Sequence, residues 1–264
     1  MSKKVAIVTG GTSGIGRATA LALQERGYTV YELSRRAEGM PDIRHIVADI
    51  TKEETLQAAV EQVLAVEGRL DLVVNNAGFG ISGAIEFTDT QEAQRLFDTL
   101  FFGMVRMNRC VIPLMRQQGH GRIVNISSVA APVPIPFQAY YSAGKAAINA
   151  YTMALANELR PFGVTVCAVM PGDIHTGFTA ARRKVSAGDD IYQGRISRSV
   201  KRMEHDEETG MSAEDAAAYV AKMALRRRSS PLKALGAPYK AAAAAAKLLP
   251  RRVSNYIVGR MYAK

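Results

Sequence analysis

Tyr141 and Lys145, which stand four residues apart, are the residues best suited to proton transfer in this sequence. On a helix, side chains at this spacing lie on one face, so both can reach the same site. A tyrosine hydroxyl titrates near pH 10, which is too high for an acid–base catalyst at neutral pH. A nearby ammonium group stabilises the phenolate, so we expect Lys145 to lower the pKa of Tyr141. An isolated pair of this kind is more often structural, so the interpretation needs support from other motifs.

A glycine-rich turn near the N-terminus gives that support. The segment VAIVTGGTSGIGRATALAL runs from an apolar strand through Gly10, Gly14 and Gly16 into a helical pattern. Such glycines permit a tight turn and let a pyrophosphate approach the backbone at the positive end of a helix. Taken alone, the pattern also fits a glycine turn that binds nothing.

Three motifs in order, TGxxxGIG at 9–16, NNAG at 75–78 and YSAGK at 141–145, resemble the short-chain dehydrogenase/reductase family. The resemblance covers roughly residues 4–180 and continues weakly to about residue 225. It is closer to the hydroxysteroid and retinol dehydrogenases than to the acyl-carrier-protein reductases. It implies reversible oxidoreduction between a secondary alcohol and a ketone, with a nicotinamide cofactor that carries the hydride.

The resemblance also assigns catalytic roles. Ser128, 13 residues before Tyr141, would hold the substrate oxygen, and Tyr141 would transfer the proton. Lys145, together with the positive charge of an oxidised nicotinamide, would lower the pKa of Tyr141, and it would also grip the ribose. Tyr140 has Gly144 where its lysine would be, so we interpret it as wall or packing, and Ser127 is the weaker serine.

The end of the second strand predicts the cofactor. A carboxylate there would bind a ribose 2′-hydroxyl, whereas arginine favours a 2′-phosphate. The segment VYELSRR has Ser34, Arg35 and Arg36 at this point, which favours NADP(H), although the arginines could also be a solvated strand end. The residues expected to bind NADP(H) are Gly10, Thr12, Ser13, Gly14, Ile15, Gly16, Ser34, Arg35, Asp49, Ile50, Asn76, Ala77, Gly78, Tyr141, Lys145, Pro171, Gly172, Ile174 and Thr176.

One position departs from the family pattern. Relatives carry an asparagine that holds a water beside the lysine, and the segment DTLFFGMVR places Leu100 there. Leucine cannot hydrogen-bond, and Asn108 is not positioned by the pattern to replace it. A rival hypothesis is therefore a catalytically weakened NADP(H)-binding sensor or scaffold protein.

The residues expected to contact substrate are mostly apolar and predict a bulky lipophilic substrate such as a steroid: Phe79, Ile81, Val129, Phe137 and Phe178, with Ile174. We interpret His175 as substrate wall or surface, because a tyrosine–lysine pair already supplies the proton. Four histidines and no clustered acids predict no metal site.

Short β-branched runs alternate with helical patterns over the first 175 residues, which is typical of α/β proteins. Near-continuous apolar strands predict a doubly wound parallel sheet of Rossmann type, covered by helices on both faces. The expected strands are Val5–Val8, Thr29–Leu33, Ile43–Val47, Leu70–Val74, Gly121–Asn125 and Val164–Val169, and the expected helices are Gly14–Arg26, Lys52–Glu67, Ala93–Gln117 and Ser142–Arg160. We predict a catalytic domain over 1–225 with a substrate loop at 178–210, then a basic helical C-terminal extension at 226–264.

Composition limits the classes of partner. The net charge of +10 is concentrated at the C-terminus, because residues 222–264 hold 11 Lys and Arg and no acidic residue. The body is near neutral, which argues against nucleic-acid binding. Two cysteines without close spacing fit a reducing cytoplasm, and no apolar run is long enough to span a bilayer.

The extension mixes basic and apolar residues. A helix from Leu249 would place Leu249, Val253, Tyr256 and Ile257 on one side. We favour packing of this helix against the protein, and peripheral contact with an anionic membrane is the alternative. Family members commonly form dimers or tetramers, so we expect a homo-oligomer.

Overall fold

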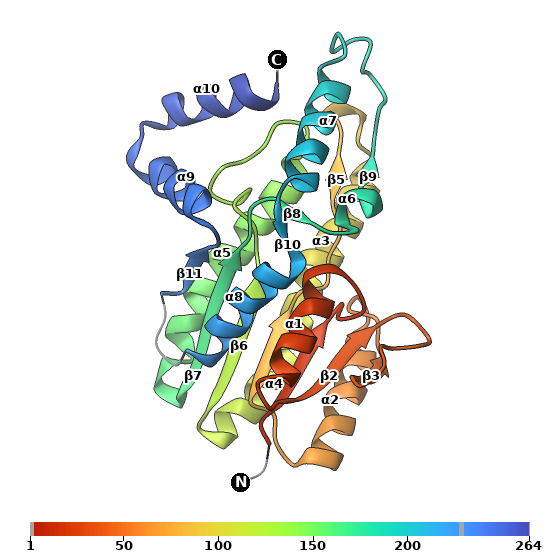
Figure 1. The fold of residues 1–264 in the computed structure, drawn as a ribbon, viewed down its shortest axis with the longest axis vertical. Coiled ribbons are helices and arrows are strands. Elements are labelled where there is room, and N and C mark those ends of the chain that lie inside the picture. The colour runs from red at the N-terminus through yellow and green to blue at the C-terminus, as the bar shows by residue number, and fades with distance from the viewer. Residues whose placement is uncertain (1–2, 227–229, 264) are drawn as a thin grey trace.

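The computed structural model describes residues 3–226 and 230–263, and its centre is a seven-stranded parallel sheet (Figure 1). The strands lie in the order β11-β7-β6-β4-β1-β2-β3, so the direction of winding reverses between β1 and β4. Ligands of doubly wound sheets bind at such a reversal, beyond the carboxyl ends of the strands. The strands are β1 (Val5–Thr9), β2 (Thr29–Ser34), β3 (Arg44–Val47), β4 (Leu72–Asn75), β6 (Gly121–Ile126), β7 (Val164–Met170) and β11 (Leu232–Ala234).

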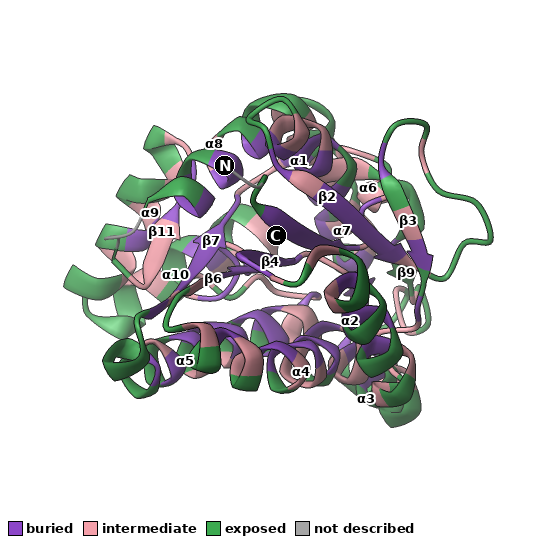
Figure 2. Ribbon diagram, turned by 90° about the horizontal axis from the view of Figure 1, so that it is seen from below, coloured by how far each residue is buried: buried purple, intermediate pink, exposed green. Residues whose placement is uncertain are grey.

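Helices cover both faces of this sheet, as Figure 2 shows from its edge. The helices α1 (Gly14–Gln24) and α8 (Ala213–Leu225) pack together on one face, and α2 (Glu53–Glu67), α4 (Gly103–Gln118) and α5 (Ala139–Glu158) lie on the other. Successive residues of a strand point to opposite faces, so Ile7 is buried beneath α2 and α4 while Val8 is buried on the side of α1 and α8. The predicted doubly wound α/β fold is confirmed.

The predicted helix over 93–117 is interrupted. It consists of α3 (Thr90–Phe97), a π-helical turn at Asp98–Phe102, and α4. π-Helical turns are rare and often occur at functional sites, and this one contains Leu100. The helix α5 begins three residues earlier than expected, so Tyr141 lies in its first turn. Two short 3-10 turns occur at Ile85–Phe87 and Arg160–Phe162.

The predicted substrate loop at 178–210 contains more regular structure than expected. It holds α6 (Phe178–Ala181) and α7 (Arg195–Glu208). Two-residue strands tie it to the body: β8 (Ile174–His175) pairs with β10 (Met211–Ser212), and β5 (Ile81–Ser82) pairs with β9 (Arg183–Lys184). The helix α8 begins with a side-chain cap, because Ser212 Oγ accepts a hydrogen bond of 3.1 Å from the Asp215 amide.

The C-terminal extension contains two further helices, α9 (Ala237–Leu248) and α10 (Arg251–Tyr262), so its predicted helical character is confirmed. Before them, β11 pairs with β7 at the edge of the main sheet, which the sequence did not indicate. The helix α10 returns to α7, where Tyr262 Oη donates a hydrogen bond of 3.1 Å to Asp206 Oδ2. The domain boundary at 225/226 stays a prediction.

Among residues 3–226 and 230–263, no helix combines the length and the apolarity needed to cross a membrane.

Candidate active site

A cleft of about 1390 Å³ opens at the carboxyl ends of the central strands. It is lined by the three predicted catalytic residues and by every predicted cofactor residue except Gly16. The residues come from the ends of β1, β2, β4, β6 and β7, from the first turns of α1 and α5, and from the two C-terminal helices. Segments far apart in sequence therefore meet where the sheet reverses its winding.

The turn between β1 and α1 is shaped by its glycines. Gly10 has a φ of +65°, which favours glycine, and a Cβ on Gly16 would stand 2.3 Å from the carbonyl oxygen of Gly10. Gly16 thus packs beneath the turn and does not line the cleft. Asn76 Nδ2 donates to the carbonyl oxygens of Thr9 (3.1 Å) and Gly10 (3.3 Å), which fixes the turn against the end of β4.

The N-terminus of α1 faces the cleft through this turn. Ser13 stands at the N-cap in an extended conformation, its side chain does not cap the helix, and the first turn contains no acidic residue. The first backbone N–H groups of the helix therefore have no partner within it, and the helix dipole favours an anion there. This geometry fits a nucleotide pyrophosphate.

At the end of β2, Ser34, Arg35 and Arg36 all line the cleft, and both arginines are exposed. Asp49 follows β3 and lies close enough to Arg35 to be stabilised by its charge. Burial acts to raise the pKa of Asp49, but hydrogen bonds from Thr51 (3.0 Å from its amide, 2.8 Å from Oγ1) hold it below its usual value. Asp49 is therefore an ionised acceptor.

The sequence left one acid of β2 without a role. Glu32 points to the same face of the sheet as Ser34, but it is fully buried and paired with His45. It lies directly beneath Gly11, because a Cβ added to Gly11 would stand 2.6 Å from the Glu32 Cβ. Burial raises the pKa of Glu32. Because it lies beneath the glycine turn and outside the cleft lining, this acid does not take the place of a carboxylate at the ribose.

The segment after β4 completes the nucleotide side. Thr9 Oγ1 accepts hydrogen bonds from the amides of Asn76 (3.0 Å) and Ala77 (3.1 Å). A Cβ on Gly78 would stand 2.3 Å from Leu100 Cδ2, so a side chain at this position would require Leu100 to move.

Ser128, Tyr141 and Lys145 meet on the opposite wall. The phenol of Tyr141 has a hydrogen-bonding interaction with Ser128, and Lys145 Nζ lies 5.5 Å from the centre of the tyrosine ring. The lysine is 5% exposed and donates a hydrogen bond of 2.7 Å to the carbonyl oxygen of Ile126. Ser127 is buried and donates to the Lys145 carbonyl oxygen at 3.1 Å, so it positions the lysine backbone.

The expected lowering of the tyrosine pKa does not occur in the protein alone. Burial, with a smaller contribution from the carboxylate of Glu207, raises the pKa of Tyr141 to about 12, although the interaction with Ser128 acts to lower it. Burial also lowers the pKa of Lys145 to about 7, which weakens the charge that was expected to stabilise a phenolate. The sequence argument counted the ammonium but not the removal of both groups from water.

The segment after β7 contributes four of the predicted cofactor residues to the cleft. Pro171, Gly172, Ile174 and Thr176 all line it. Thr176 stands next to the glycine turn, because a Cβ on Gly14 would lie 3.4 Å from the Thr176 Cβ. His175 is exposed, its Nδ1 interacts with the Glu208 carbonyl oxygen at 3.0 Å, and it does not line the cleft.

Four of the predicted substrate residues line the cleft, namely Phe79, Val129, Ile174 and Phe178. Phe178 packs against Tyr141 with ring centres 5.7 Å apart. The other two are placed elsewhere. Ile81 is 2% exposed in a core cluster with Leu96, and Phe137 packs edge-on against Tyr192 at 5.6 Å. The two-residue strand β5 and the positive φ of Phe137 (+59°), which turn these side chains away, carry no clear sequence signal.

Leu100, which the resemblance aligns with the family asparagine, is a buried apolar side chain, 2% exposed, between Gly78 and Gly144. Asn108 belongs to a separate buried network in which Asn75 Nδ2 donates to Asn108 Oδ1 at 2.8 Å. It does not line the cleft, so it does not replace the missing asparagine. Tyr140 also lies outside the lining, with its hydroxyl 3.5 Å from the Ile85 carbonyl oxygen.

Several lining residues were missed by the sequence. Asp173 and Glu207 present carboxylates to the cleft, while Arg182, the ion-pair partner of Glu207, does not line it. Tyr239 Oη donates a hydrogen bond of 2.7 Å to Asp173 Oδ2. These side chains come from α7, α9 and the β7–β8 turn, and only the folded chain shows that these elements meet.

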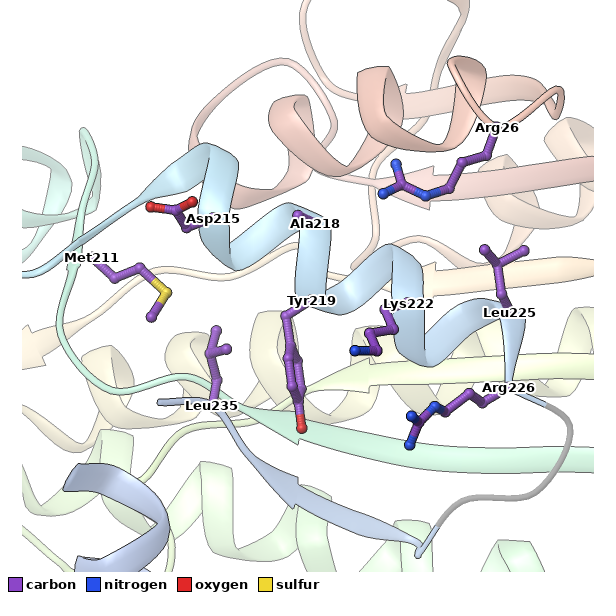
Figure 3. A pocket seen from close by; sticks show the side chains of 9 residues that line it. All are labelled: Arg26, Met211, Asp215, Ala218, Tyr219, Lys222, Leu225, Arg226 and Leu235. Atoms are coloured by element: carbon purple, nitrogen blue, oxygen red, sulfur yellow. The ribbon is translucent and has the colours of Figure 1, made fainter. Parts of the chain in front are cut away.

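A second, more open hollow of about 740 Å³ lies along α8 (Figure 3). Its lining includes Arg26, Tyr219, Lys222 and Arg226 and none of the predicted catalytic residues. We therefore place the active site in the cleft. Among the described residues, no three potential metal ligands of the His, Cys, Asp and Glu types gather at one place.

Comparison with known proteins identifies the family. The sequence model of the short chain dehydrogenases matches residues 4–187, and the chain belongs to this family of oxidoreductases, which act on CH–OH or C=O groups. It is 39% identical to a 3-ketodihydrosphingosine reductase of Bacteroides thetaiotaomicron, over 86% of each chain. Its fold is similar to a short-chain dehydrogenase of Streptomyces avermitilis (32% identity, 91% and 90% coverage, TM-score 0.82). Similar solved structures hold either NADH or NADP.

Proposed function

We propose that this protein reduces a ketone to a secondary alcohol, reversibly, with NADP(H) as cofactor. The observation that carries the proposal is that Ser128, Tyr141 and Lys145 meet in one cleft with the glycine turn and the N-terminus of α1. A nicotinamide supplies the hydride when bound. The chain must then hold the substrate oxygen and deliver one proton to it.

Each catalytic side chain has one task in this scheme. Ser128 donates a hydrogen bond to the carbonyl oxygen, and Tyr141 gives the same oxygen its proton as the C=O group becomes CH–OH. The raised pKa keeps the Tyr141 phenol protonated at neutral pH, so a proton is present for reduction. Transfer of that proton requires the pKa to fall, and the positive charge that a nicotinamide gains as it gives up the hydride would lower it. Lys145 holds the ribose hydroxyls and replenishes the proton on Tyr141, because its pKa near 7 allows it to exchange protons at neutral pH.

The choice of NADP(H) over NAD(H) rests on the end of β2. Arg35 and Arg36 line the cleft, and Ser34 stands where an acid would disfavour a 2′-phosphate. Guanidinium groups bind phosphate through paired, charge-assisted hydrogen bonds. Similar solved structures hold either NADH or NADP, so they do not decide between the two cofactors. The preference for NADP(H) therefore rests on Ser34, Arg35 and Arg36 alone.

The substrate we propose is a bulky lipophilic ketone. Within that class, which includes steroids, a long-chain amino ketone is favoured by the 39% identity to a 3-ketodihydrosphingosine reductase. The carboxylates of Asp173 and Glu207 support this, because both line the cleft and both are near enough to Tyr141 to raise its pKa. An amino group beside the carbonyl would be attracted to them.

The decisive experiment is an NADPH-oxidation screen with 3-ketodihydrosphingosine, its N-acetylated form, steroid ketones and small ketones. We expect turnover of 3-ketodihydrosphingosine, and a lower rate when the amine is acetylated. Turnover of steroid ketones alone would reject the amino ketone but leave the oxidoreductase proposal intact.

The second candidate function is an NADP(H)-binding sensor or scaffold, and the observation that favours it is the buried Leu100. Tight NADPH binding by calorimetry, with no turnover of any ketone in the screen, would establish this alternative and reject the reductase. We also propose that the protein is cytoplasmic and that it forms a homo-oligomer. Sedimentation velocity tests the oligomer.

For the C-terminal extension we propose packing on the protein, supported by the contacts of α10 with α7 and with the cleft. The alternative is an anionic membrane surface, favoured by the exposed Val253, Tyr256 and Met261 beside Arg251 and Arg252. Salt-sensitive sedimentation of the full chain with anionic liposomes would overturn the packing proposal.

A further inference from the structure

The cleft continues beyond the reacting groups toward the C-terminus of the chain. Ala242, Ala245 and Ala246 of α9 line it, as do Ile257, Val258 and Met261 of α10. In Figure 1 these two helices form an arm that leaves the edge strand β11 and returns to α7. The wall they build is part of the same cavity that contains Tyr141.

The side chains on this wall are all apolar. The three from α9 are alanines, which have the smallest side chain that a helix can present. Their spacing of i, i+3 and i+4 puts them on one face of α9, while Ala241 and Ala244 on the other side are exposed. The alanine run therefore leaves free width along the cleft where larger side chains would fill it.

The cleft is larger than a site for one drug-sized ligand, which measures roughly 300–1,000 Å³. Its volume of about 1390 Å³ includes the proposed nucleotide site as well as the space along α9 and α10. The far wall is partly open, since Ile257 is 45% and Met261 55% exposed although both line the cavity. A flexible chain can thus run along α9 and emerge past α10.

We propose that α9 and α10 form the binding site for the apolar chain of the ketone substrate, and that the alanine face of α9 sets the chain width and length accepted. This deepens the proposed reductase function and rests on it. The carbonyl end lies at Ser128 and Tyr141, and the hydrocarbon lies against the alanines. Each methylene removed from water in this channel raises the affinity, by roughly two- to fourfold at most.

The test is a series of 2-amino-3-ketones with the same head group and chains shortened from that of 3-ketodihydrosphingosine to eight and four carbons. For the wild-type protein with NADPH, kcat/KM should rise with chain length. Ala245→Phe should reduce kcat/KM for the longest ketone by about tenfold or more and change that for the shortest by less than about twofold. Ala244→Phe makes the same change on the exposed side of the same helix and should alter neither.

The outcomes separate this inference from the function on which it rests. Equal losses for short and long ketones in Ala245→Phe, or no effect of chain length in the wild type, would overturn the inference and leave the reductase intact. If no ketone is turned over, binding of the same ketones along α9 can still be measured by the displacement of a bound apolar dye, Nile red. Displacement that grows with chain length and is lost in Ala245→Phe would support the chain site, and its absence would overturn it. Ala245→Leu serves if the phenylalanine variant fails to fold.

Discussion

The two sides of the cleft are built in different ways. The nucleotide side uses the ends of β1 and β4 and the turn into α1, where backbone groups and glycines do most of the shaping. The substrate side uses two-residue strands, α6, α7 and the α9–α10 arm, where side chains form the wall. A cofactor common to a whole family can be bound by backbone geometry, which a short motif encodes. A substrate particular to one member requires side chains that long-range packing brings together.

The largest expected effect on activity is at Tyr141, which lies where the nucleotide side and the substrate side of the cleft meet. Tyr141→Phe removes only the acidic hydroxyl, so ketone reduction should fall by more than about 100-fold while NADPH affinity changes little. Steady-state NADPH oxidation and calorimetric binding measure the two quantities. Tyr140→Phe is the matched control, because the neighbouring hydroxyl lies outside the cleft lining, and it should keep near-normal activity. Retention of activity within about tenfold, roughly 1.4 kcal/mol of barrier, would reject the role of Tyr141.

The second prediction concerns Lys145, whose burial we expect to lower the stability of the folded protein. Its pKa is lowered from 10.5 to about 7 by burial, so the unfolded chain binds the proton more tightly. The folded state of the cofactor-free protein is therefore destabilised below pH 7 by up to ~5 kcal/mol. Lys145→Met should abolish activity yet raise the free energy of unfolding at pH 6, less about 1 kcal/mol for the lost bond to Ile126.

The stability difference between Lys145→Met and the wild-type protein should depend on pH. Because the wild-type penalty disappears as the pH rises from about 7 toward 10.5, the stability advantage of Lys145→Met should shrink over that range. Urea unfolding at pH 6, 8 and 10 measures it. An advantage that stays constant with pH would mean that the ammonium remains well solvated in the folded protein.

The same contrast explains what the sequence could predict. The parallel sheet, the glycine turn and the meeting of Ser128, Tyr141 and Lys145 follow from local periodicity and family motifs, and the structure brings those residues together. Ile81 and Phe137 were misplaced as substrate contacts because a two-residue strand and a positive φ decide their direction. Asp173 and Glu207 were missed because their place depends on how α7 packs. The tyrosine pKa was expected to fall, since burial of both partners cannot be read from spacing.

On the nucleotide side, the strand-end arginines can be tested by reversing a charge. Arg35→Asp should weaken NADPH binding by about tenfold and reverse the preference between NADPH and NADH, because the carboxylate repels a 2′-phosphate and accepts from a 2′-hydroxyl. Binding constants for both cofactors measure this. Arg26→Asp makes the same charge change away from the cleft and should leave both constants nearly unchanged. A wild-type protein that prefers NADH would show that our interpretation of β2 is wrong.

The smallest expected change in activity is at Leu100, which the resemblance places where relatives carry an asparagine. The leucine is buried against Gly78 and Gly144, so Leu100→Asn exchanges apolar packing for an amide and should destabilise the protein by about 2 kcal/mol. Asn75 Oδ1 is buried without a hydrogen-bond partner in the described structure, and it lines the same small cavity as Leu100, so the new amide has an acceptor nearby. Activity per folded molecule should stay the same or rise, because the change adds a polar group to the lining of the cleft that also contains Lys145. Leu100→Met, which keeps the site apolar, separates the two effects when kcat and urea unfolding are measured together. A strong loss of kcat in well-folded Leu100→Asn, with Leu100→Met normal, would mean that the apolar side chain itself serves catalysis, and proton supply would then have to pass through other groups.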